Sequence, residues 1–190
     1  LFDGSWDYEP HTYQAGRISL LSNPTHIYGK EPVLFYELIQ LMSQAEERVI
    51  FQSPYVVCNS WMYEELAELA KKVPDTRILL NSVENGDNFV ASSDYLRHKD
   101  EVVATGIQLY EYDGGTSNHG KSVLIDQDLS VVGSYNLDLR STYLDTELML
   151  VVQSEELNQE LEGYLTAMQE SSRKVIDADT YELPEGLEVQ

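Results

Sequence analysis

Six residues at fixed spacing constrain this chain more than any other feature of its sequence. In the order H-x-K-x4-D-x6-G-S-x-N, they are His119, Lys121, Asp126, Gly133, Ser134 and Asn136. The pattern lies in a segment with two short apolar runs, Val123–Ile125 and Leu129–Val132, which indicate two buried strands. A turn at Gln127 and Asp128 separates these runs. The sequence therefore predicts a β-hairpin that carries the motif.

The residue types suit the cleavage of a phosphodiester in two steps. A neutral imidazole nitrogen can carry the phosphoryl group as a covalent phosphohistidine, which makes His119 the candidate nucleophile. Side chains two residues apart in an extended segment lie on the same face, so we expect Lys121 beside His119, where its ammonium can bind phosphate oxygens. Ser134 and Asn136 can offer a hydroxyl and an amide to the same phosphate. Gly133 lets the backbone pass close to the site.

The motif resembles the phosphodiesterase motif of the phospholipase D superfamily. Over about residues 17–170, the chain is similar to the C-terminal half of bacterial cardiolipin synthase-type members of that superfamily. The segments that carry this resemblance are Ser53-Pro54-Tyr55, Ile78-Leu79-Leu80-Asn81-Ser82, Gly106-x-x-Leu109-Tyr110-Glu111, Gly133-Ser134-x-Asn136-x-Asp138-x-Arg140-Ser141 and Thr146-Glu147.

The resemblance gives roles to two carboxylates that spacing alone does not place. Asp126 would serve mainly as a structural partner. Glu147 stands at the head of the apolar run Leu148–Val152. There the family has a carboxylate that accepts a hydrogen bond from the second nitrogen of the motif histidine. That bond would fix the tautomer and the orientation of the His119 ring.

The resemblance implies a phosphatidyltransferase that acts on phospholipid phosphodiesters through a phosphohistidine, in the manner of cardiolipin synthases. Relatives carry two copies of the motif, and their two halves pack so that both histidines face one phosphate. The N-terminal histidine is usually the nucleophile, which would make His119 the general acid of the first step and the base of the second. Spacing alone leaves the role of His119 open. The resemblance implies neither a metal nor an organic cofactor.

This sequence contains one copy of the motif. It begins with Leu1, and residues 1–16 show no element of a first catalytic half, so we expect the chain to be the C-terminal half of a longer protein. The alternative is a single-motif family member that completes its site by homodimerisation. The expected partner is accordingly an N-terminal half or a second copy, and the isolated chain is expected to be inactive.

Charge and hydropathy limit the other partners. The sequence has 12 basic and 33 acidic residues and a net charge of −21. Nucleic acids and anionic membranes normally require a basic patch, and none is apparent, so no nucleic-acid partner is expected. A phospholipid hydrolase, a nuclease and a non-catalytic interaction module stay open as alternatives. No apolar run approaches the roughly 20 residues that span a bilayer, so we expect this chain to be soluble and the full-length protein to be membrane-associated.

Strand and helix signals alternate along the chain, which predicts an α/β domain with a layered mixed sheet flanked by helices. Besides the hairpin, the predicted strands are 17–21, 49–52, 77–80, 107–112 and 147–152. The predicted helices are 33–47, one capped by Asn59 or Ser60, one from Ser92 or Ser93 to Ala104, and one capped by Ser154. We predict a leader at 1–16, the phospholipase D-like catalytic domain at 17–174 and an acidic tail at 175–190.

The remaining histidines and the cysteine give no second site. His98, Lys99 and Asp100 are adjacent in a predicted helix and cannot converge on one point, so we interpret them as a solvated face. His11 and His26 lack the spacing of metal ligands, and the single Cys58 has no partner, so no zinc site is predicted.

Overall fold

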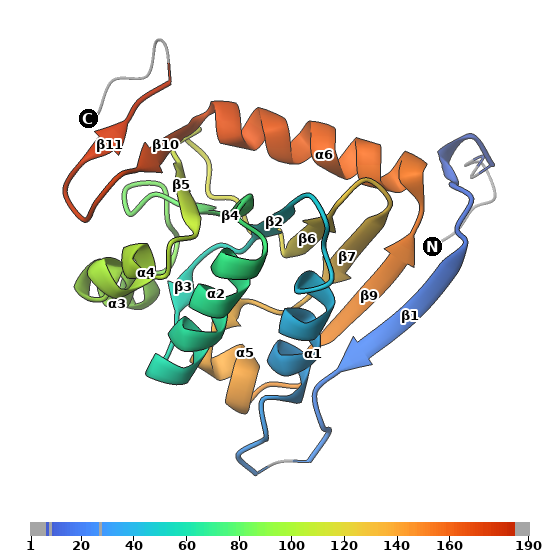
Figure 1. Cartoon of the computed structure of the whole chain (residues 1–190), viewed down its shortest axis with the longest axis horizontal. Coiled ribbons are helices and arrows are strands. Elements are labelled where there is room, and N and C mark those ends of the chain that lie inside the picture. The colour runs from blue at the N-terminus through green and yellow to red at the C-terminus, as the bar shows by residue number, and fades with distance from the viewer. Residues whose placement is uncertain (1–6, 8, 27, 185–190) are drawn as a thin grey trace.

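A nine-stranded mixed sheet forms the centre of the computed structural model, which describes residues 7, 9–26 and 28–184 (Figure 1). The strand order is β1-β9-β7-β6-β2-β4-β5-β10-β11. Strands β2, β4 and β5 are parallel to one another, and the other neighbouring pairs are antiparallel. The bounds are β1 (Arg17–Ser22), β2 (Val49–Gln52), β4 (Thr76–Asn81), β5 (Gln108–Tyr112), β6 (Ser122–Ile125), β7 (Leu129–Gly133), β9 (Leu148–Gln153), β10 (Ser172–Val175) and β11 (Tyr181–Glu182).

Helices cover both faces of this sheet, which confirms the predicted layered α/β class (Figure 1). Helix α6 packs over β5, β6, β7 and β10 on one face, while α1 and α2 lie on the other. A separate two-stranded parallel sheet joins β3 to β8. The remaining bounds are η1 (Glu9–His11), α1 (Val33–Met42), β3 (Val56–Val57), α2 (Ser60–Lys72), α3 (Phe89–Arg97), α4 (Lys99–Ala104), β8 (Leu137–Asp138), α5 (Leu139–Tyr143) and α6 (Glu155–Glu170).

The two faces of each central strand belong to different parts of the core. Successive side chains of a strand point to opposite faces. On β2, Val49 and Phe51 therefore join α1 and α2 in the larger apolar cluster, whereas Ile50 meets Leu165 of α6 in the smaller one. Burial on both faces explains why the central strands read as continuous apolar runs.

Helix boundaries agree with the predicted caps in part. Asn59 accepts a hydrogen bond from the Met62 amide and begins α2. Ser154 does the same for the Leu157 amide at the start of α6. The helix predicted from Ser92 or Ser93 is instead two helices, α3 and α4, which are separated at His98. Of the helices in the described part of the chain, none is long and apolar enough to cross a membrane.

The interpretation of Lys99 as part of a solvated face is wrong. Its side chain is 2% exposed, and its Nζ lies 2.7 Å from a carboxylate oxygen of Glu111 on β5. The second oxygen of Glu111 lies 2.8 Å from Nε of Arg173 on β10. Tyr95 also donates to Glu111, at 2.8 Å. Lys99 is buried because the fully buried carboxylate of Glu111 on β5 lies beneath α4.

The sequence analysis did not predict β10 and β11. Strand β10 pairs with β5, and β11 pairs with β10. Val175, the first residue of the predicted acidic tail, ends β10 and is buried. The sheet therefore continues into the stretch that was interpreted as a tail.

Candidate active site

His119 lies in the loop between β5 and β6, beyond the end of β2. The side chain of His119 is exposed, and both nitrogens of its ring have partners. Nε2 lies 3.2 Å from the hydroxyl of Tyr55, and Nδ1 lies 2.7 Å from Nζ of Lys121. A lysine ammonium has only donors, so Nδ1 accepts this hydrogen bond. The ring proton of His119 is then on Nε2, which donates to the Tyr55 oxygen.

Lys121 folds back onto His119, as the motif spacing predicts for two side chains on one face. Its Nζ also donates to the His119 carbonyl at 2.6 Å. Burial lowers the pKa of Lys121, and the negative charges of Glu147, Asp87 and Asp138 oppose that shift. In the described part of the chain, the hydrogen-bond partners of Lys121 Nζ are therefore both on His119, while the three carboxylates act on it only through their charge.

Glu147 is buried, and its two oxygens bind two serine hydroxyls. Ser134 donates to one oxygen, and Ser141 donates to the other at 2.8 Å. The family role expected of Glu147 was to accept a hydrogen bond from His119. Within the residues that the structure describes, His119 is not among the hydrogen-bond partners of Glu147. In this arrangement the carboxylate orients the serines of the motif region.

Ser134 and Asn136 come from the chain that leaves β7. The Ser134 hydroxyl is exposed and accepts a hydrogen bond from the Leu148 amide at 3.1 Å. The side-chain nitrogen Nδ2 of Asn136 donates to the Ser141 hydroxyl at 3.4 Å. The Asn136 side-chain oxygen is buried and has no hydrogen-bond partner among the described residues. Ser134 is therefore at the surface with its hydroxyl bound to Glu147 and to the Leu148 amide, while Asn136 is held partly beneath the surface.

Gly133 ends β7 where two chains approach closely. A Cβ atom at this position would lie 2.1 Å from the Leu148 carbonyl oxygen. Any larger residue would push β7 away from β9. The close approach is thus between β7 and β9, and the expected approach of the backbone to a bound phosphate at Gly133 stays a prediction.

Asp126 lies at the opposite end of the hairpin from His119. Its carboxylate accepts hydrogen bonds from the backbone amides of Glu46, Glu47 and Arg48, at 3.0, 2.8 and 3.0 Å. Burial alone would raise the pKa of Asp126, but these amides together hold it below its ordinary value. The residue has a positive φ of 50°, a conformation that aspartate and asparagine adopt more readily than most residues. These contacts support a structural role.

Tyr55 is a site residue that the sequence analysis did not select. It follows the buried strand β2 in the turn Ser53-Pro54-Tyr55, which was quoted only for the family resemblance. Burial raises the pKa of the Tyr55 hydroxyl, so the phenol stays protonated. The available signal was its position, because residues just beyond the carboxyl ends of parallel strands commonly form ligand sites.

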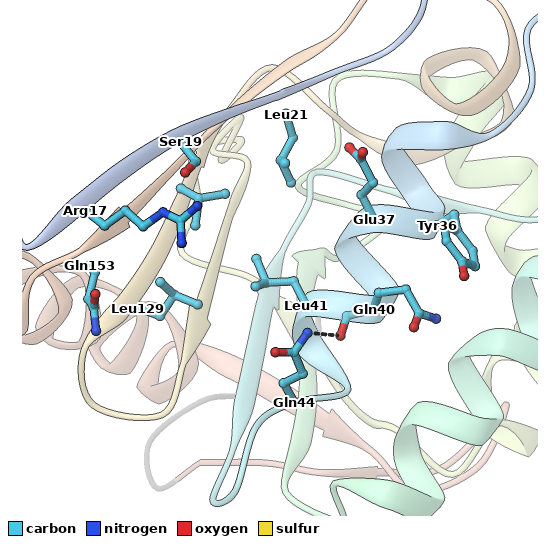
Figure 2. Close-up of a pocket in the computed structure, with 11 residues that line it drawn as sticks. Arg17, Ser19, Leu21, Tyr36, Glu37, Gln40, Leu41, Gln44, Leu129 and Gln153 are labelled. Carbon is cyan, nitrogen blue, oxygen red and sulfur yellow. Dashed lines mark hydrogen bonds between the residues drawn. The ribbon is translucent and has the colours of Figure 1, made fainter.

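A pocket of about 640 Å³ lies apart from the motif, between α1 and strands β1, β7 and β9 (Figure 2). Arg17, Leu21, Glu37, Leu41 and Leu129 are among its lining residues, and none of the lining residues belongs to the motif. Over residues 7, 9–26 and 28–184, no group of three or more His, Cys, Asp or Glu side chains is placed to hold a metal ion.

Comparison with known proteins places these features in a family. Residues 38–169 match the family described as cardiolipin synthase, PLD-like domain. Cardiolipin synthase A of Pseudomonas syringae is 30% identical over 163 residues, which are 86% of this chain and 33% of that protein. Cardiolipin synthase A of Klebsiella pneumoniae is 31% identical over 122 residues, 64% of this chain and 24% of that protein. The chain spans a third or less of the length of these relatives.

Solved structures share the fold at lower identity. The phospholipase D family member Nuc from Salmonella typhimurium superposes with a TM-score of 0.66 at 15% identity, covering 84% of this chain and 97% of that one. Phosphatidylserine synthase from Haemophilus influenzae gives 0.65 at 15% identity, covering 87% of this chain and 41% of that one. At these identities the likeness concerns the fold alone.

Proposed function

The chain belongs to the phospholipase D superfamily, in the family of cardiolipin synthase-type domains, and on this premise we propose that it transfers phosphatidyl groups between alcohols. The observation that carries the proposal is the grouping of His119, Lys121 and Tyr55 beyond the end of β2. These side chains supply a proton-transfer group, a cation for the phosphate and a phenol at the reacting nitrogen.

In the proposed reaction a histidine nitrogen attacks the phosphorus of a phospholipid. An N–P bond forms, and the P–O bond to the leaving alcohol breaks. A second histidine, which enters this step as a protonated imidazolium, gives that alcohol its proton and becomes neutral. An incoming alcohol then loses its proton to the same second histidine, and its oxygen displaces the first histidine from phosphorus. We assign His119 the role of the second histidine, acid first and base afterwards.

Lys121 must change partners in this reaction. In the ligand-free structure its Nζ donates to Nδ1 of His119. A phosphate that carries negative charge is a stronger acceptor than a neutral imidazole, so we propose that Lys121 turns to the phosphate oxygens when substrate binds. The exposed Ser134 hydroxyl can exchange its partner Glu147 for the same phosphate.

The proposed site needs a second histidine from outside this motif. One imidazole cannot act on both sides of the same phosphorus, and His119 is exposed, which leaves its outer side open. We propose that an N-terminal half of a longer, membrane-associated protein supplies the second histidine, or that a second copy of this chain does so.

Two other reactions use the same residues. Hydrolysis of phospholipids needs the same residues and differs only in whether water or an alcohol reaches the phosphohistidine intermediate. Cleavage of nucleic acids is disfavoured by the net charge of −21, because a polyanion normally needs a basic groove.

The test uses membranes that contain the complete protein and labelled phosphatidylglycerol, with the lipid products resolved. Formation of cardiolipin with release of glycerol is the expected result. Accumulation of phosphatidic acid without cardiolipin, with acceptor lipid in excess, would favour the hydrolase. Recovery of unchanged phosphatidylglycerol would contradict both reactions.

A further inference from the structure

Two buried amide side chains lie at the carboxyl ends of neighbouring parallel strands, beneath the loop that carries His119. Gln52 ends β2 and is 2% exposed, and Asn81 ends β4 and is 5% exposed. Buried amides are costly unless they are hydrogen-bonded, so their partners indicate what they stabilise. Both side chains bind Asn118, the residue immediately before His119.

Asn81 holds the backbone of Asn118 at both of its polar groups. The Asn118 amide donates to Oδ1 of Asn81 at 2.9 Å. Nδ2 of Asn81 donates to the Asn118 carbonyl at 2.8 Å. One side chain therefore makes the pair of hydrogen bonds that a neighbouring strand would make.

Gln52 holds the other side of the loop through the Asn118 side chain. Its Nε2 donates to Oδ1 of Asn118 at 2.7 Å, and its Oε1 accepts from the Ser122 hydroxyl at 2.8 Å. The same Oδ1 of Asn118 accepts from the Gly120 amide at 2.9 Å. A Cβ at Gly120 would lie 2.5 Å from Nε2 of Gln52, so the loop rests directly on this amide.

We infer that Asn81 and Gln52 are positioning residues for His119. The His119 side chain is exposed, and the chain on both sides of it is held from below. Asn118 is bound by both buried amides, and the Gly120 amide donates to the Asn118 side chain. Proton transfer requires the imidazole within hydrogen-bond reach of the reacting oxygen, so a mobile loop would lower the rate of the chemical step. The catalytic part of this inference rests on the proposed function, whereas the clamp itself can be observed without turnover.

The test compares Asn81→Leu and Gln52→Met with a control, Asn158→Leu. The Asn158 side chain is also buried, and its Nδ2 donates to the Leu129 carbonyl at 2.9 Å, at the end of β7 away from Gly133 and the His119 loop. Loss of a buried amide should lower stability in all three variants. Only the first two should disturb His119.

Two measurements separate positioning from stability. The first, on the 190-residue chain, is NMR of the His119 ring together with hydrogen exchange of the Asn118 and Gly120 amides. We expect faster exchange and loss of the single ring tautomer in Asn81→Leu and Gln52→Met, but not in Asn158→Leu. The second is turnover of phosphatidylglycerol by the complete protein, where kcat should fall about 10²-fold in the clamp variants with little change in KM.

Each result decides a different point. Unchanged exchange and an unchanged tautomer in the clamp variants would overturn the inference. So would an altered loop with wild-type kcat. If the wild-type protein has no turnover while the NMR changes appear as expected, the clamp on His119 is supported and the proposed function fails.

Discussion

The phenol oxygen of Tyr55 lies 3.2 Å from Nε2 of His119. With Lys121 donating to Nδ1, the proton of the ring points at this oxygen. The Tyr55 oxygen thus occupies a position from which a substrate alcohol could exchange a proton with His119. The sequence analysis expected Glu147 to orient the ring, but in this structure Tyr55 and Lys121 contact it.

Tyr55→Phe should lower kcat by up to about tenfold, because the variant loses one hydrogen bond to the imidazole and keeps the ring. The measurement is steady-state turnover of phosphatidylglycerol by the complete protein. Tyr36→Phe, on the exposed surface of α1 and away from the motif, is the matched control and should behave like wild type. Equal kcat values for Tyr55→Phe and Tyr36→Phe would show that the Tyr55 hydroxyl does not contribute to the reaction.

His119→Ala should abolish turnover in the complete protein, while Glu147→Gln should cost less. Loss of the imidazole removes the proton-transfer step, and such assistance is worth about 10²- to 10⁴-fold. The glutamine can still accept from one of the two serines, so part of the site survives. Thermal unfolding of each variant controls for loss of the fold. Wild-type turnover in His119→Ala would show that the motif is inactive.

Asp126→Asn tests the charge at the hairpin turn without straining its backbone, because asparagine tolerates positive φ. The pKa of Asp126 is lower in the folded chain than its ordinary value. The carboxylate therefore stabilises the fold above its unfolded pKa, and that contribution disappears as the pH falls through the folded pKa. We expect the variant to be about 1–2 kcal/mol less stable at pH 7 in urea unfolding.

The difference in unfolding free energy between wild type and variant should narrow below about pH 4, the ordinary aspartate pKa, because the unfolded wild-type chain takes up a proton there before the folded chain does. A constant difference between pH 7 and pH 3 would show that the charge of Asp126 is not the cause.

Two glycine substitutions should change stability in opposite directions. Gly133→Ala places a Cβ 2.1 Å from the Leu148 carbonyl and should cost about 1–3 kcal/mol. Gly163→Ala lies within α6, where nothing is within 4 Å of the added atom. It should stabilise by up to about 1 kcal/mol, since alanine favours the helix. Chemical unfolding of both variants measures the two values, and a stable Gly133→Ala would disprove the close approach.

Glu111→Gln should destabilise the fold more than Lys99→Met. Glu111 pairs with both Lys99 and Arg173, so its neutralisation leaves two buried cations without their shared carboxylate. Breaking a buried pair from one side typically costs about 3–5 kcal/mol. In Lys99→Met the carboxylate keeps Arg173 and Tyr95. The free energies of unfolding in urea give the order, and the reverse order would contradict this account.

Most strands of the sheet and the motif could be predicted from the sequence, because apolar runs and short fixed spacings are local signals. It did not reveal β10, whose residues Ser172–Val175 are mostly polar and do not alternate. Arg173 and Lys99 resemble surface residues until Glu111 is placed between them, and only the folded chain does that.

The same limit applies in the candidate site. His119 and Lys121 are two residues apart, and their proximity follows from spacing alone. Tyr55 reaches the ring across 64 residues of sequence, and Asn81 reaches the loop across 37. Such contacts depend on which strands are neighbours in the sheet, and periodicity does not specify that order.

The carboxylate of Glu111 connects parts of the chain that lie far apart in sequence. It joins α4 to β10, and Tyr181 of β11 receives a further hydrogen bond from Lys99 at 2.5 Å. If the hairpin of β10 and β11 detached, Glu111 would lose Arg173 and Lys99 would lose Tyr181, which would leave buried charges under α4 without these partners. This hairpin should therefore open only when the whole domain unfolds. Proteases should then cleave between Ser172 and Glu182 no earlier than in the rest of the folded chain.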